Sequence, residues 1–90
     1  MIFEVQKVEK NFILILKEDW NWNDDQGKIV TIKSIHKTKH SNKNILHFKL
    51  KQLLEGELIE LRNPMAFAEG CLACDVFLQG ENIIDILREG

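Results

Sequence analysis

The chain lacks the features that define several large classes of protein. Its 90 residues include one proline and five glycines, and 44% of them are hydrophobic. Such a chain can offset the entropy of folding by burying apolar side chains, which excludes a fully disordered protein. Its longest apolar run covers residues 12–16, far short of the roughly 18 residues of a membrane-spanning helix. We expect one small soluble domain over residues 1–90 and no membrane partner.

Signals for export and for a disulfide framework are also scarce. The first residues run directly into an alternating pattern, without a basic region or a small-residue cleavage site. The only cysteines, Cys71 and Cys74, are too few and too close in sequence to stabilise a fold through disulfide bonds. Thiols of this kind usually remain reduced in the cytosol. The sequence therefore predicts a cytoplasmic protein.

Signatures of catalysis are missing as well. The glycines are scattered singly and form no phosphate-binding loop. No serine or cysteine stands at the spacing from a histidine that a known hydrolase family uses. A core built from 90 residues also leaves little room for a substrate pocket. We expect a protein that is not an enzyme and that needs no cofactor.

The chain does have an uneven distribution of charge. Residues 1–27 carry three lysines and six carboxylates, and residues 52–90 carry two arginines and eight carboxylates. Residues 28–51 carry seven lysines and all three histidines, without any arginine or carboxylate. Nucleic-acid binding would favour arginine in this basic segment, because its guanidinium group can form paired hydrogen bonds. The segmentation therefore favours a protein partner or self-association through complementary patches.

Patterns of period two predict strands over the first two thirds of the chain. Residues 18–27 between two of these strands are rich in Asp and Asn and are predicted to form a long loop. Residues 45–54 fit either a strand or a helix that ends at Gly56. The predicted strands are 2–8, 12–16, 29–37 and 56–61.

The last third of the chain indicates a helix. Asn63 and Pro64 suit a helix start, and apolar residues recur on one helical stripe as far as Gly80, a suitable stop. Residues 83–87 fit a strand or a helical turn. This order predicts an α+β fold, with a small antiparallel β-sheet of about five strands covered by one C-terminal helix. The alternative is a small all-β barrel in which residues 72–78 pair as a strand. The stripe consists of Phe67, Cys71, Cys74 and Leu78.

Two histidines and the two cysteines have the spacing of a zinc site. His36 and His40 are four residues apart, and Cys71 and Cys74 are three apart. Two imidazoles and two thiolates are the donors that tetrahedral zinc prefers. The pattern resembles the HHCC zinc site in the amino-terminal domain of retroviral integrases. It implies a zinc-stabilised nucleic-acid-binding domain as the alternative function. Without metal, the cysteines would pack as small hydrophobic residues or form a redox pair.

Two tryptophans in the predicted loop provide the leading candidate site. Trp20 and Trp22 would point to the same side of an extended backbone, next to Asp24 and Asp25. Tryptophans concentrate at the centres of protein interfaces, although one or both could instead close the core of so small a domain. We therefore predict a protein-binding module, such as an adaptor, an inhibitor or an assembly subunit. A second set of candidate contacts comes from the basic segment and consists of Lys33, Lys37 and Lys39.

Overall fold

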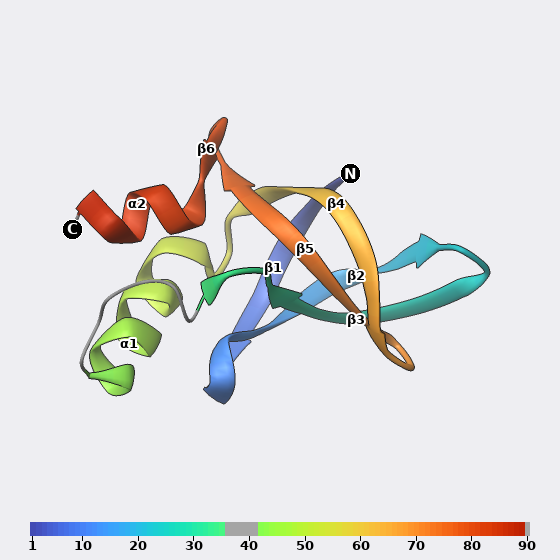
Figure 1. Cartoon of the computed structure of the whole chain (residues 1–90), viewed down its shortest axis with the longest axis horizontal. Helices are drawn as coiled ribbons and strands as arrows, with labels where there is room; N and C mark the ends of the chain where they lie inside the picture. The colour runs from blue at the N-terminus through green and yellow to red at the C-terminus, as the bar shows by residue number, and fades with distance from the viewer. Residues whose placement is uncertain (36–41, 90) are drawn as a thin grey trace.

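The computed structural model describes residues 1–35 and 42–89 (Figure 1). These residues form strands and helices that wrap around one core. In the described residues no helix is both long and apolar enough to cross a membrane. In chain order the elements are β1 (Ile2–Glu9), the 3-10 turn η1 (Lys10–Phe12), β2 (Ile13–Trp22), β3 (Asp25–Ile32), α1 (Lys43–Leu54), β4 (Leu58–Ala68), β5 (Cys71–Leu78), β6 (Glu81–Asn82) and α2 (Ile83–Glu89).

The first five strands close into a mixed β-barrel. Strands β1, β2 and β3 follow one another as antiparallel neighbours, and β4 returns to lie beside β1. Strand β5 pairs antiparallel with β4 and parallel with β3, which closes the barrel. The order β4-β1-β2-β3 is a Greek key. With a 12-residue helix and a short C-terminal helix, the fold is α+β with a barrel core.

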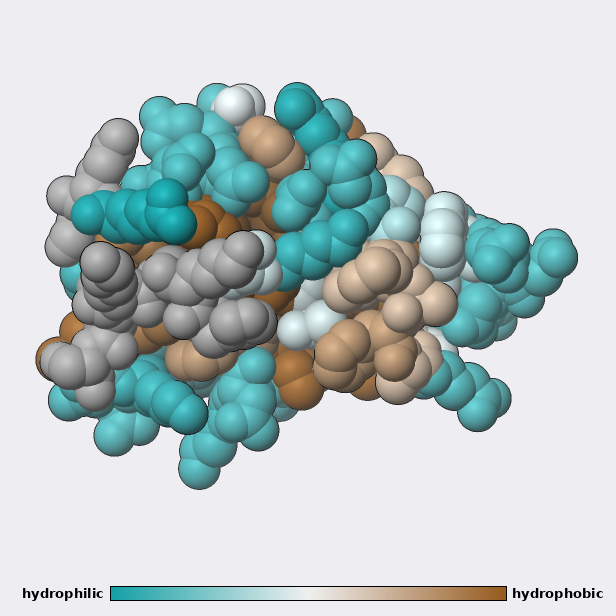
Figure 2. Space-filling model, in the orientation of Figure 1, coloured by the Kyte–Doolittle hydropathy of each residue, from teal (hydrophilic) through white to brown (hydrophobic). Residues whose placement is uncertain are grey.

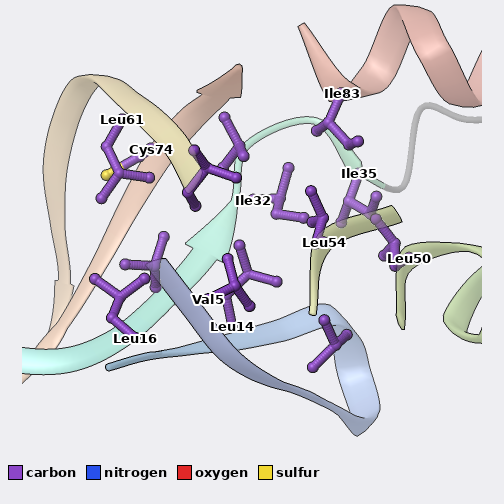
Figure 3. Close-up of a cluster of buried hydrophobic side chains, with 14 of the residues drawn as sticks. Val5, Leu14, Leu16, Ile32, Ile35, Leu50, Leu54, Leu61, Cys74 and Ile83 are labelled. Carbon is purple, nitrogen blue, oxygen red and sulfur yellow. The ribbon is translucent and has the colours of Figure 1, made fainter. Parts of the chain in front are cut away.

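Alternating side chains fill the barrel. On β5, Leu72, Cys74 and Val76 are buried and point inward, because successive side chains of a strand face opposite sides. Leu61 of β4 lies close to Cys74 in this core, and Leu16 of β2 belongs to the same cluster (Figure 3). The interior is therefore largely aliphatic, and the buried ring of Trp20 joins it.

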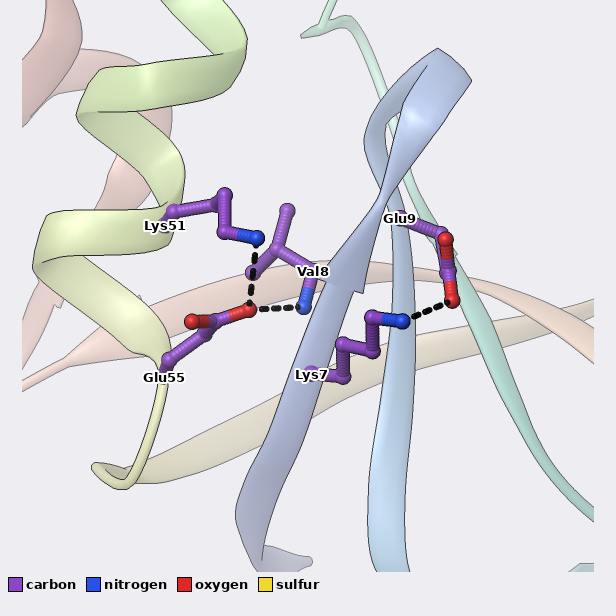
Figure 4. Close-up of polar contacts among 5 residues, drawn as sticks. All are labelled: Lys7, Val8, Glu9, Lys51 and Glu55. Atoms are coloured by element: carbon purple, nitrogen blue, oxygen red, sulfur yellow. Dashed lines mark hydrogen bonds and ion pairs between the residues drawn. The ribbon is translucent and has the colours of Figure 1, made fainter.

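Helix α1 packs beside β1 and the β1–β2 turn. The side-chain oxygen of Asn42 accepts hydrogen bonds from the backbone N–H groups of Asn44 and Ile45 at 2.9 and 3.3 Å, so Asn42 caps the helix. At the other end, Glu55 Oε2 accepts a hydrogen bond from the Val8 backbone at 2.8 Å and lies 3.6 Å from Lys51 Nζ (Figure 4). The Val8 bond lowers the pKa of Glu55. Leu46, Leu50 and Leu54 face the core.

The predicted C-terminal helix that begins at Asn63 and Pro64 is wrong. Residues 63–78 instead form the end of β4, a turn and β5. The helical stripe was misleading because Cys74 lies on a strand, where Leu72, Cys74 and Val76 are buried with period two. The pairing of residues 72–78 in a barrel is thus confirmed, while the all-β class of that alternative is wrong because α1 and α2 are present.

Three further expectations are settled by the backbone. The predicted loop over 18–27 is wrong, since β2 and β3 continue through it as a hairpin. Residues 45–54 take the helical alternative, because Leu46, Leu50 and Leu54 recur every four residues and meet the core. Gly80 does not end a helix. It lies with a φ of +83° in the turn between β5 and β6.

Candidate functional site

The β2–β3 hairpin places the two predicted tryptophans differently. Its tip is a tight turn at Asn23 and Asp24, which both have positive φ, as a two-residue hairpin turn requires. Trp20 is fully buried, and its Nε1 donates a hydrogen bond to the backbone oxygen of Ile29 at 3.0 Å. Trp22 is only partly buried against the core. Trp22 is therefore the tryptophan that a partner could contact.

The start of β3 lies directly against the β4–β5 turn. The backbone N–H of Gly70 donates a hydrogen bond to Asp25 Oδ2 at 3.3 Å. A Cβ atom on Gly27 would lie 2.3 Å from the backbone oxygen of Gly70, so only glycine allows this approach. Two segments more than forty residues apart in sequence therefore form one continuous surface.

This surface carries an exposed apolar patch. Phe67 is 67% exposed, Met65 is 53% exposed and Ile29 is 40% exposed. The strand register places Ile29 beside Cys71, and Cys71 beside Ala68. Figure 2 shows pale brown, apolar atoms gathered on this face, over the end of β4 and the β4–β5 turn. We define the β4 patch as Ile29, Met65, Ala66, Phe67 and Ala68.

The pairing of β4 explains why the patch is exposed. Strand β1 pairs with β4 only over residues 58–60, whereas β5 pairs with β4 as far as Ala68. Among the described strands, none pairs with the β1-side edge of β4 beyond residue 60. Pro64 and the positive φ of Asn63 interrupt this edge, and the register shifts there. Such irregularities discourage pairing with another strand, so the side chains of the patch are its available contacts.

Carboxylates surround the patch on the hairpin side. Asp24 and Asp25 are exposed at the hairpin tip, and Glu69 is exposed in the β4–β5 turn. Nearby on β2, Asp19 forms a marginal ion pair of 4.0 Å with Lys28. Carboxylates therefore outnumber cations around this apolar surface, and a basic partner would be attracted to it.

Of the three predicted lysine contacts, the structure describes Lys33. Lys33 Nζ donates to the backbone oxygen of Asn63, whose side chain donates to Asp75 Oδ2 at 2.8 Å. Lys33 therefore bridges β3 to β4 across the outside of the barrel. The other two residues of the predicted set, Lys37 and Lys39, lie outside the described residues.

The cysteines are placed poorly for a shared metal ion. Cys71 and Cys74 are three residues apart on β5, so their side chains point to opposite faces of the strand. Burial raises the pKa of the Cys74 thiol to about 11 and also raises the pKa of Cys71. Both shifts disfavour the thiolate that zinc binding and redox exchange require. His36 and His40 lie outside the described residues. Within residues 1–35 and 42–89, no three His, Cys, Asp or Glu residues gather to hold a metal.

Sequence reasoning missed the residues at the centre of the patch. Phe67 was assigned to a helical stripe, and Met65 and Ile29 were assigned no role. The available signal was the uncharged run of residues 65–68 that follows Pro64. No family model, curated protein or solved structure matches the chain. Its function must therefore be argued from the surface itself.

Proposed function

We propose that this protein is a non-enzymatic protein-binding module and that the β4 patch is its binding surface. The observation that carries the proposal is the exposure of Met65 and Phe67 on a strand end that has no second neighbour among the described strands. Contiguous apolar patches on a protein surface commonly mark interaction sites. Aromatic residues and methionine are also enriched at interface centres.

The surroundings of the patch define the kind of partner that suits it. Phe67 and Met65 would bury apolar side chains of the partner. The exposed Asp24, Asp25 and Glu69 would attract lysine or arginine at the rim. The favoured partner is therefore a protein segment that carries apolar and basic side chains together.

A nucleic acid or an oligosaccharide is a second candidate because of the barrel. A five-stranded Greek-key barrel is the architecture of the OB-fold, whose second and third strands often face such ligands. On this barrel the outward positions of β2 and β3 include Ile13, Ile15 and Ile29. Oligonucleotide binding in such folds relies on aromatic rings and basic side chains. Aliphatic side chains at these positions favour a protein partner instead, since a fold alone does not determine a ligand.

The test compares two charge substitutions at exposed apolar positions. Phe67→Glu places a carboxylate inside the β4 patch, whereas Leu58→Glu places one at a position that is 63% exposed and outside the patch. A partner captured by the wild-type protein is purified, and its affinity is measured by titration calorimetry. We expect Phe67→Glu to weaken binding by at least about tenfold, the loss typical of an interface hot spot, and Leu58→Glu to leave it unchanged. Equal affinities for all three proteins would refute the role of the patch.

A further inference from the structure

We infer that the β4 patch binds the outer face of helix α1 of a second copy of this chain, so that copies associate head to tail. The inference rests on the proposed function and names the partner of that surface. An amphipathic helix laid on an apolar surface is a common mode of recognition. Here one chain carries both a helix face and a surface of complementary charge.

The outer face of α1 is apolar at its centre. Phe48 is 60% exposed and Ile45 is 52% exposed, and the two lie three residues apart on one side of the helix. The opposite side is formed by the leucines that enter the core. Phe48 and Ile45 therefore form an exposed apolar pair on the helix, as Phe67 and Met65 do on β4.

The flanks of this helix face are basic. Lys49 lies one turn after Ile45, and Lys51, which also pairs with Glu55 at 3.6 Å, lies three residues after Phe48. Residues 43–54 contain no Asp or Glu, whereas the β4 patch is rimmed by Asp24, Asp25 and Glu69. Docking would therefore place the apolar centre of the helix face on the apolar centre of the β4 patch, with the basic flanks of the helix beside the acidic rim of the patch. The opposite charges would also speed the association of the two copies.

The position of the two surfaces excludes their contact within one copy. Figure 1 shows α1 and the β4–β5 turn on opposite sides of the molecule along its longest axis, whose extent is 37 Å. A contact between two different surfaces of identical copies is heterologous and builds open chains or closed rings. The product would therefore be a concentration-dependent series of oligomers, unlike the single closed dimer of a symmetric interface.

The experiment uses the full chain without a tag in sedimentation velocity at increasing concentration, from about 20 μM to about 1 mM, because small interfaces associate weakly. We expect the average mass of the wild type to rise with concentration and the association to weaken as salt is raised, because salt screens the charged rim. Leu58→Glu is the matched control and should behave as the wild type.

Two variants test the head-to-tail geometry. Phe67→Glu blocks the β4 patch, and Phe48→Glu blocks the helix face; both positions are exposed, so both variants should fold, which circular dichroism checks. Each variant alone should be monomeric. An equal mixture should form dimers and nothing larger, because each pair retains one intact patch and one intact helix face.

Three outcomes would overturn the inference: a monomeric wild type at about 1 mM, single variants that still associate, or a mixture that stays monomeric. The outcome for the proposed function is separate. A monomeric wild type whose captured partner is lost with Phe67→Glu would overturn self-association alone. A partner that also ignores Phe67→Glu would overturn both.

Discussion

The two halves of β4 differ in the burial of their apolar side chains. In the first half, Ile59 and Leu61 are 1% and 2% exposed, between β1 on one side and β5 on the other. In the second half, Met65 and Phe67 are 53% and 67% exposed, and β5 is the only described neighbour. Ile59 and Leu61 are the inward residues of the half that lies between two strands, whereas the second half extends beyond β1. The half that extends beyond β1 is the surface that we propose for binding.

The largest predicted effect tests this contrast directly. Leu61→Ala removes a side chain from the closed part of the barrel, and we expect it to lower the free energy of unfolding by about 2–5 kcal/mol. Phe67→Ala removes a larger side chain from the exposed half and should change it by no more than about 0.5 kcal/mol. Urea denaturation of both variants measures the difference. A Phe67→Ala variant as destabilised as Leu61→Ala would show that the second half is part of the core.

The contact between Gly27 and Gly70 fixes the second half against β3. Gly27→Ala would bring a Cβ atom within 2.3 Å of the Gly70 backbone oxygen, and we expect the forced shift to cost about 1–3 kcal/mol in the free energy of unfolding. Gly80→Ala is the comparison, because it has open space but a φ of +83°, which costs about 1–2 kcal/mol through backbone strain alone. Gly27→Ala should also weaken partner binding, since the turn beside Phe67 must move. Gly80→Ala should leave binding intact, and equal binding losses in the two variants would contradict this role of Gly27.

The sequence predicts the closed half of the molecule better than the exposed half. Partial alternation in residues 2–8 and the short branched apolar run of residues 12–16 predict the first two strands, because their inward residues meet a continuous core. The second half of β4 has no such pattern, since Met65, Ala66, Phe67 and Ala68 are all exposed. Asn63 and Pro64 occur at helix starts and on interrupted sheet edges alike, so local chemistry could not decide between them. Pairing between β3 and β5 decides it, and that contact joins residues about forty positions apart.

The tryptophan prediction shows the same limit within one pair of residues. Trp20 and Trp22 share the local composition of the hairpin, yet only Trp20 is fully buried and bonded to the Ile29 backbone. Both rings lie on the same side of β2, but Trp22 is next to the turn at Asn23 and Asp24, at the tip of the hairpin. The distance of each ring from the core depends on how the two strands pair, which a single sequence does not show.

A smaller effect on stability is predicted at the contact between α1 and β1. Strand β1 is the neighbour that the second half of β4 lacks. Glu55 accepts the Val8 hydrogen bond, which lowers its pKa in the folded protein. A lowered pKa means that the carboxylate stabilises the fold at neutral pH and that this contribution is lost as the pH falls through the lowered value. Glu55→Gln should therefore lower the free energy of unfolding by at most about 1 kcal/mol at pH 7.

The pH dependence of stability distinguishes the loss of the Glu55 charge from a change in the shape of the side chain. The difference between Glu55→Gln and the wild type should shrink as the pH falls below the pKa of Glu55, which thermal unfolding at a series of pH values measures. Glu57→Gln, an exposed position two residues away, is the matched control. A difference that stays constant from neutral to acid pH would mean that the Glu55 carboxylate does not contribute through its charge.

The smallest perturbation compares the two cysteines, which sit beside different parts of β4. Cys71 pairs with Ala68 at the exposed end and is partly buried, whereas Cys74 is fully buried in the barrel. Burial raises the pKa of both thiols, that of Cys74 to about 11, so both should react slowly with iodoacetamide at pH 8. We expect Cys71 to react at least about tenfold faster, because the strand end can open locally while Cys74 needs unfolding of the barrel. Mass spectrometry of the adducts over time, with Cys71→Ser as the control, measures both rates. Equal rates would mean that the two halves of β4 open together. The two halves would then differ in burial but not in local stability.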